Sequence, residues 1–199
     1  MNRNHPTRFY PELTNDRLRI IASNLLDIRH STIMEMSSPF DDNYTRETSV
    51  FGRCRNMLIG MCKNKNLPWM TLGHSGMDIA FYIERVPCRF FTDDSNTPEK
   101  SGFFKRNFVD CLFDIDDQRP VMWRFIVERA LTEEDEDKVF FAGYNVYQEK
   151  VSEWMYRAST PMLHSVDDEI PPTVDISPAR IEVRDDDANS ADDDIAASK

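Results

Sequence analysis

Four carboxylates and a lysine lie close together in the sequence, in a pattern that could support metal-dependent chemistry. Asp78 and Glu84 border a short alternation of apolar and polar residues, Asp93 and Asp94 end the next such segment, and Lys100 follows. Carboxylate oxygens are preferred ligands of Mg²⁺, and a lysine can neutralise a phosphate. One hypothesis is therefore a metal-dependent enzyme that acts on nucleic acid and uses Asp78, Asp93, Asp94 and Lys100.

The spacing of these residues argues against a shared metal ion. Asp78 and Glu84 would lie about 20 Å apart along a straight strand, at ~3.3 Å per residue. The strand signature of an acid followed by Glu-x-Lys is also absent, because Arg85 and Val86 follow Glu84. We therefore favour a solvated strand face with loop-capping carboxylates, and we assign no metal and no cofactor.

The chain lacks the motifs of several large enzyme classes. It contains no P-loop, no GxGxxG fingerprint, no HExxH helix and no GxSxG elbow. His74 lies between two glycines in a sequence typical of a tight turn. The four cysteines include no CxxC pair. These absences favour a protein that works by binding.

The second of two predicted helices carries basic side chains opposite its apolar stripe. These residues are Arg46, Arg53, Arg55 and Lys63. They suggest, as an alternative function, a DNA-binding regulator that uses the basic N-terminal helices. The formal net charge of −11 disfavours nucleic acid as a partner, because a polyanion is repelled.

Aromatic side chains concentrate near the end of the predicted domain. Tyr144, Tyr147, Trp154 and Tyr156 lie in the last two predicted strands and the connection between them. A two-layer fold cannot bury both faces of such a strand fully, and exposed Trp and Tyr are typical anchors of protein interfaces. We therefore predict that these four residues bind a partner protein.

Two amphipathic helices are predicted in the first third of the chain. Residues 14–36 bear apolar side chains at three- and four-residue steps, and Thr14 is placed to cap the first turn. Residues 44–65 show the clearer apolar stripe, on which Cys54 and Cys62 lie as small hydrophobic groups.

After Pro68 the apolar pattern changes from a helical period to alternation. Strands are predicted over residues 77–84, 88–92, 121–128, 138–144 and 149–156. The first two would form a hairpin and the last three a meander. Helices followed by strands indicate an α+β fold, with two N-terminal helices packed on one face of an antiparallel sheet of about five strands. The residues expected to face the helices include Ile79, Phe81, Trp123, Phe125 and Phe141.

The charge changes toward the end of the chain. Residues 166–199 carry 11 acidic and 3 basic side chains among small polar residues. Such a composition buries too little apolar surface to offset the entropy of ordering. We therefore predict a flexible lead-in over residues 1–12, a single domain over residues 13–165 and a disordered acidic tail over residues 166–199.

The composition also bears on location and function. No apolar run approaches the ~20 residues needed to span a bilayer, and no apolar segment follows the first arginines as in a signal peptide. We therefore expect a cytoplasmic protein with free thiols and no membrane association. The expected function is that of a non-enzymatic interaction or regulatory protein that binds a partner protein. The metal-dependent enzyme and the DNA-binding regulator are its alternatives.

Overall fold

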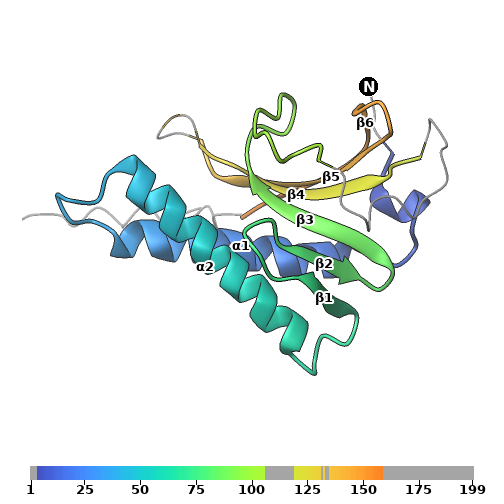
Figure 1. Ribbon diagram of the computed structural model, residues 1–199, viewed down its shortest axis with the longest axis horizontal. Helices are drawn as coiled ribbons and strands as arrows, with labels where there is room; N and C mark the ends of the chain where they lie inside the picture. The colour runs from blue at the N-terminus through green and yellow to red at the C-terminus, as the bar shows by residue number, and fades with distance from the viewer. Residues whose placement is uncertain (1–3, 106–118, 131, 133–134, 159–199) are drawn as a thin grey trace, which may run out of the picture. The chain divides into compact units, whose positions relative to one another are not determined.

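The computed structural model describes residues 4–105, 119–130, 132 and 135–158. After a short 3-10 helix, η1 (Pro6–Arg8), helices α1 (Asn15–Glu35) and α2 (Asn43–Lys63) pack on one face of a six-stranded sheet (Figure 1). Its strands are β1 (Met70–His74), β2 (Ala80–Ile83), β3 (Val86–Thr92), β4 (Met122–Glu128), β5 (Lys138–Tyr144) and β6 (Lys150–Arg157). The predicted α+β class is confirmed. The predicted tail lies outside the described residues, and the predicted domain limits stay a prediction.

Both helices begin at side-chain caps. Thr14 accepts a hydrogen bond from the backbone N–H of Arg17, and Asp42 accepts one from that of Thr45. Such caps satisfy donors that the first helical turn leaves unpaired. The buried residues of α1 and α2 recur at three- and four-residue steps, as predicted. The two helices form a hairpin whose connection is residues 36–42.

The sheet differs from the predicted antiparallel sheet at its centre. The strand order follows the chain from β1 to β6, and all neighbours are antiparallel except β3 and β4, which are parallel. The all-antiparallel prediction is wrong for this pair, because residues 93–121 carry the chain back to the start of β3. A connection of that length permits a parallel crossover, which a tight turn does not.

Strand β1 is not predicted by the sequence pattern, which there suggests only a turn. Gly73 and His74 end this strand, and it pairs with β2 through a register shift between Leu72 and His74. Strand β2 in turn begins later than expected, so Asp78 lies before it. Glu84 lies in the turn after it, with a positive φ of 53°. Asp78 and Glu84 therefore do not share one strand.

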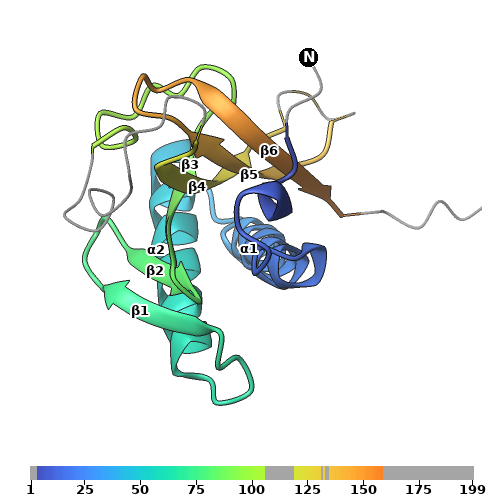
Figure 2. The same cartoon turned by 90° about the vertical axis from the view of Figure 1, so that its right-hand side faces the viewer.

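Apolar side chains cover both faces of the sheet. The larger cluster lies under the helices and contains all five residues predicted to face them. Figure 2 shows α1 beneath β4, β5 and β6, whereas β1 crosses α2 and packs against it. On the opposite face Phe103 and Phe104, from the segment after β3, pack against Tyr144. The central strand β4 is consequently buried on both sides.

Two arginines lie within this second face. Arg89 of β3 and Arg124 of β4 are direct neighbours in the parallel pair and are 3% and 0% exposed. Arg124 donates to the carbonyl of Phe103 at 3.1 Å, and Arg89 donates to the carbonyl of Gly102 at 3.2 Å. Both guanidinium groups also lie over the ring of Phe91. These contacts hold the chain after β3 against the sheet.

The N-terminal segment packs against the edge strand β6, at the end of the sheet away from β1. The carbonyl of Asn4 accepts hydrogen bonds from the Ser152 hydroxyl at 2.8 Å and from the backbone N–H of Glu153 at 3.2 Å. Tyr10 is 7% exposed, and Leu13 is fully buried. Within the described ranges, no helix is both long and apolar enough to cross a membrane.

Gly143 predicts a packing constraint in β5. A Cβ atom there would lie 2.7 Å from the Cβ of Pro120 and 2.9 Å from the ring of Trp123. Gly143→Ala should therefore lower the free energy of unfolding by about 1–3 kcal/mol through overpacking.

Gly60→Ala is the matched control. Apart from Gly60 itself, its chain neighbours and the nearby backbone of α2, no described atom lies within 4 Å of that Cβ position. The free energy of unfolding of this variant should therefore rise by about 1 kcal/mol from helix propensity. Urea denaturation of both variants measures the two opposite changes, and equal effects would contradict this account.

The burial of Cys54 and Cys62 predicts that their thiols react slowly with alkylating reagents in the native protein. Burial raises the pKa of Cys54 to about 12 and that of Cys62 to about 11, above the ordinary 9.0. At a given pH the thiolate fraction falls about tenfold per pKa unit, and the thiolate is the reactive form. Iodoacetamide should therefore modify Cys54 far more slowly in the native protein than in urea. The same difference in rate should be present but smaller for Cys62. Peptide mapping by mass spectrometry reports each site, and fast native labelling of Cys54 would refute the burial.

Candidate functional site

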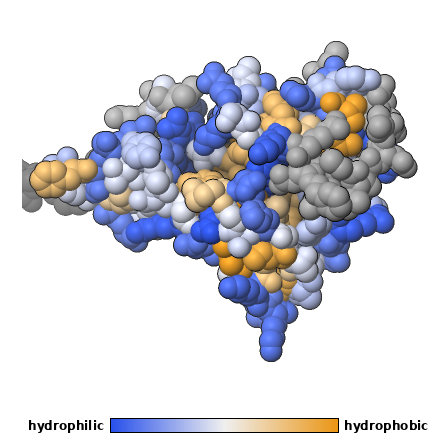
Figure 3. All heavy atoms as spheres, viewed as in Figure 1, coloured by the Kyte–Doolittle hydropathy of each residue, from blue (hydrophilic) through white to orange (hydrophobic). Residues whose placement is uncertain are grey.

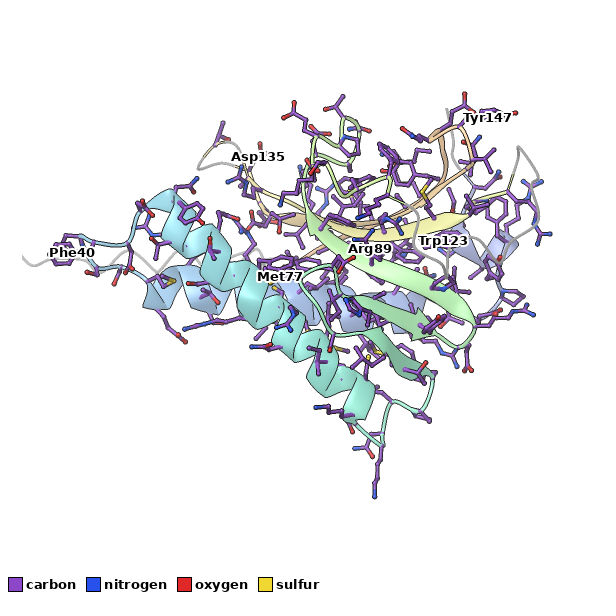
Figure 4. All side chains as sticks on the ribbon, in the orientation of Figure 1. Phe40, Met77, Arg89, Trp123, Asp135 and Tyr147 are labelled. Atoms are coloured by element: carbon purple, nitrogen blue, oxygen red, sulfur yellow. The ribbon has the colours of Figure 1, made fainter. Side chains whose placement is uncertain are left out.

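The end of the helix hairpin, formed by the last turn of α1, the connection and the first turn of α2, presents three large apolar side chains to solvent. Met34, Phe40 and Tyr44 are 67%, 92% and 78% exposed, and we call them the hairpin tip. Figure 4 shows Phe40 at the end of the hairpin, beyond the strands, and Figure 3 shows apolar surface at the same place. Single exposed apolar residues are ordinary, but three around one turn mark a candidate binding surface.

Short-range hydrogen bonds order the connection that carries Phe40. The backbone N–H of Asp41 donates to the carbonyl of Ser38 at 2.9 Å, and the Asp41 carboxylate accepts the Ser38 N–H at 3.0 Å. The Phe40 N–H donates to the Ser38 hydroxyl at 3.3 Å. Asp42 then caps α2. The exposed ring of Phe40 therefore extends from a hydrogen-bonded turn.

A buried arginine joins the hairpin to the sheet. Arg29 of α1, 6% exposed, donates to both oxygens of Glu47 in α2 at 3.1 Å and to Asp137 at 2.7 Å. Arg129 lies 3.6 Å from Glu47, and Asp137 also accepts the backbone N–H of Ala130 at 2.8 Å. Charge-assisted bonds with this geometry are strong. This Arg29 network connects both helices to the chain between β4 and β5.

A cleft of about 680 Å³ opens beside the hairpin tip. It lies between the first turn of α2 and the segment after β3, and five of its side chains are carboxylates. The lining residues are Asn43, Tyr44, Glu47, Thr92, Asp93, Asp94, Thr97, Glu99, Lys100, Glu128 and Arg129. Tyr44 belongs both to the hairpin tip and to this acidic cleft. The two features therefore form one continuous surface.

The carboxylates of the acidic cleft order the loop that carries them. Asp93 accepts the backbone N–H groups of Glu99 and Lys100 at 3.2 and 3.0 Å. Asp94 accepts two more at 2.6 and 2.9 Å, and Glu128 accepts one at 3.1 Å. Backbone amides carry no net charge. These bonds therefore hold the loop in place without cancelling the negative charge of the acidic cleft.

Two groups in the acidic cleft have shifted pKa values. Hydrogen bonds from the backbone N–H groups of Thr97 and Asn96 lower the pKa of Asp94 below 3.8, so this carboxylate stays charged near neutral pH. Partial removal of the Lys100 ammonium from water lowers the pKa of this side chain below 10.5, while the residue as a whole is exposed. The carboxylates of Asp93 and Glu47 oppose that shift. Lys100 therefore lies in a partly shielded and negatively charged environment.

The structure brings together only part of the proposed metal site. Asp93, Asp94 and Lys100 line the acidic cleft. Asp78 lies before β2, where it is 3.7 Å from Arg89 of β3. Among the residues that the structure describes, no group of three or more His, Cys, Asp or Glu side chains could hold a metal ion. Asp93 and Asp94 thus order the loop that carries them, whereas Asp78 lies apart from them beside Arg89.

The basic residues of α2 take part in separate contacts. Arg46 donates to the carbonyl of Met36 at 3.0 Å, and Arg53 pairs with Glu35 of α1. Arg55 donates through Nε to the carbonyls of Ser75 and Gly76, in the connection between β1 and β2, at 3.0 and 2.9 Å. Lys63 lies in the last turn of α2. The predicted basic face is thus divided between α1 and the β1–β2 connection.

The four predicted partner-binding aromatics are also divided. Tyr144 is 2% exposed, and its hydroxyl donates to the carbonyl of Ser95 at 3.2 Å. Trp154 and Tyr156 stack on one another and pack at the edge of the helix-side core. Tyr147, in the turn before β6, is 64% exposed. These residues therefore lie on both faces of the sheet and do not form one surface.

Sequence reasoning missed the hairpin tip. A signal for Phe40 is present, because a large aromatic stands among Ser, Pro and Asp in a connection too short to have its own core. Glu47, Glu99 and Glu128 come from three distant segments. The packing of α2 on the sheet and the crossover between β3 and β4 together bring them to one cleft.

No protein-family model, curated protein or solved structure matches this chain.

The Arg29 network predicts a large difference between two arginine variants. Arg29→Met should lower the free energy of unfolding by about 2–4 kcal/mol, because it leaves two carboxylates without their buried partner. Arg53→Met, which removes a pair whose side chains are 44% and 61% exposed, should cost at most about 1 kcal/mol. Urea denaturation compares the two variants. Equal losses would show that the Arg29 network does not hold the hairpin.

Proposed function

We propose that this chain is a non-enzymatic interaction protein that binds a partner protein through its hairpin tip. The observation that carries the proposal is the exposure of Met34, Phe40 and Tyr44 around one ordered turn. Large apolar and aromatic side chains provide most of the binding energy in protein interfaces. A surface that exposes them together is an interaction surface in this proposal.

The attachment of the hairpin supports this proposal. Arg29 holds α1 and α2 together and joins them to Asp137 in the chain beyond β4. The turn around Phe40 has its own hydrogen bonds. A surface held in one arrangement before binding loses less entropy when a partner docks. The proposal therefore needs no ordering of the hairpin on binding.

The proposed site differs from the aromatic site suggested by the sequence. Tyr144 is buried, and Trp154 and Tyr156 pack at the edge of the helix-side core. The three residues of the hairpin tip are more exposed than Tyr144, Trp154 and Tyr156, and they lie at one end of the helix hairpin. The proposed class of function, partner-protein binding, is the same as the one expected from the sequence.

Phe40→Ser tests the proposed function. The full-length protein, its Phe40→Ser variant and the control variant Met77→Ser are used to capture proteins from nuclease-treated host lysate. Met77 is 73% exposed in the connection between β1 and β2, away from Phe40 in Figure 4. Recovery of a dominant partner should fall about tenfold or more for Phe40→Ser, since a central aromatic anchor contributes ~2 kcal/mol or more. Met77→Ser should retain the partner.

The thermal unfolding of both variants serves as the folding control. Both substituted side chains are exposed, so each variant should keep wild-type stability to within about 0.5 kcal/mol. A partner that Phe40→Ser retains at the wild-type level, or the lack of any nuclease-resistant partner, would overturn the proposed function.

A further inference from the structure

We propose that the segment bound beside the hairpin tip is a basic stretch of another protein, which lies in the acidic cleft with an apolar side chain against Tyr44. This inference rests on the proposed function and specifies the chemistry of its partner. It depends on three observations: a cleft of about 680 Å³, the exposed aromatic ring of Tyr44 in its lining, and an excess of negative charge among its lining residues.

The acidic cleft and the hairpin tip share Tyr44, a residue that is 78% exposed. A segment that covered Phe40 and continued along α2 would therefore enter the cleft directly. The tyrosine ring offers an apolar face to a leucine or phenylalanine, and it attracts a lysine or arginine through its π-electrons. Apolar and cationic side chains can thus alternate along one bound segment.

The charge of the acidic cleft identifies the occupant. Five lining carboxylates face two lining cations, Lys100 and Arg129, so the lining has a net charge of −3. Glu47 is already paired with Arg29 and Arg129. The uncompensated charge therefore lies on the loop side, at Asp93, Asp94, Glu99 and Glu128.

Glu99 can offer its carboxylate to a partner without giving up a role in ordering the loop. It is exposed, and its side chain makes no hydrogen bond or ion pair with the residues that the structure describes. By contrast, Asp93 and Asp94 hold the loop through backbone N–H groups. Glu99 can consequently be changed without removing a bond on which the loop depends.

The same charge disfavours the other occupants. A second copy of this chain has a net charge of −11, and residues 166–199 of the chain itself carry 11 acidic against 3 basic side chains. Nucleic acid would place phosphates against carboxylates. Like charges brought together at an interface cost several kcal/mol, whereas complementary charges steer and align a partner. A basic segment of a different protein is the occupant that fits.

The test uses a defined peptide and the full-length protein. The probe is a fluorescein-labelled peptide, Gly-Lys-Leu-Lys-Phe-Lys-Leu-Lys-Gly, and its control has every Lys replaced by Gln. Fluorescence anisotropy measures the binding of each. The lysine peptide should bind and lose affinity steadily between about 50 and 500 mM salt, because salt screens exposed charges. The glutamine peptide should bind about tenfold more weakly or not at all.

Two charge reversals separate a specific cleft from general attraction. Glu99→Lys should weaken binding of the lysine peptide about tenfold or more. Asp27→Lys makes the same change in net charge at an exposed position of α1 outside the cleft, and should change the affinity less than about twofold. Equal weakening by both variants would show attraction to bulk charge only and would overturn the cleft. No binding to the wild-type protein would also overturn it.

The outcome for the cleft is separable from that for the hairpin tip. If Glu99→Lys binds the peptide as the wild type does, the basic partner is refuted, while the lysate capture with Phe40→Ser still decides the proposed function. If the captured partner depends on Phe40 and also on Glu99, both proposals are supported together. A partner that depends on Phe40 but not on Glu99 refutes the cleft alone.

Discussion

The buried guanidinium of Arg29 is the contact on which the arrangement of this molecule depends. It joins Glu47 of α2 and Asp137 beyond β4 to α1, and so fixes the position of α2, whose first residues form one wall of the acidic cleft. Removing a guanidinium from water is costly unless its donors are used, and here each nitrogen donates to a carboxylate. The network thus favours one placement of the hairpin on the sheet, from which the hairpin tip and the acidic cleft both follow.

The crossover between β3 and β4 is the second constraint. Because these central strands are parallel, the chain after β3 must return across the sheet, and Arg89 and Arg124 hold its residues near Phe103 through backbone carbonyls. The start of this crossover carries Asp93 and Asp94, whose carboxylates bind neighbouring backbone N–H groups. One feature of topology therefore buries the second face of the sheet and also places an ordered, negatively charged loop opposite the N-terminal turn of α2.

These constraints explain why the same carboxylates suggest two different functions. In the sequence, Asp78, Asp93 and Asp94 resemble a dispersed metal site. In the structure, Asp78 lies near Arg89, while the other two cap a loop and retain their charge toward solvent. Exposed charge next to an exposed aromatic residue suits recognition of a cationic protein segment, which needs complementary charge and apolar contact more than a fixed coordination geometry.

The sequence by itself determined the features that depend on local periodicity. The helix cap at Thr14, the apolar stripes of both helices and the β5 strand follow from residues that are near one another in the chain, so their energetics can be evaluated from the sequence. Other features depend on contacts between distant segments. They are the parallel pairing of β3 with β4, the edge strand β1, the burial of Tyr144, and the convergence of Glu47, Glu99 and Glu128. Short Gly- and Ser-containing stretches are compatible with either a turn or an edge strand, and hydrogen bonds from β2 select the strand. Only the tertiary structure decided these features, because the partner groups that stabilise them are supplied by the fold and not by sequence neighbours.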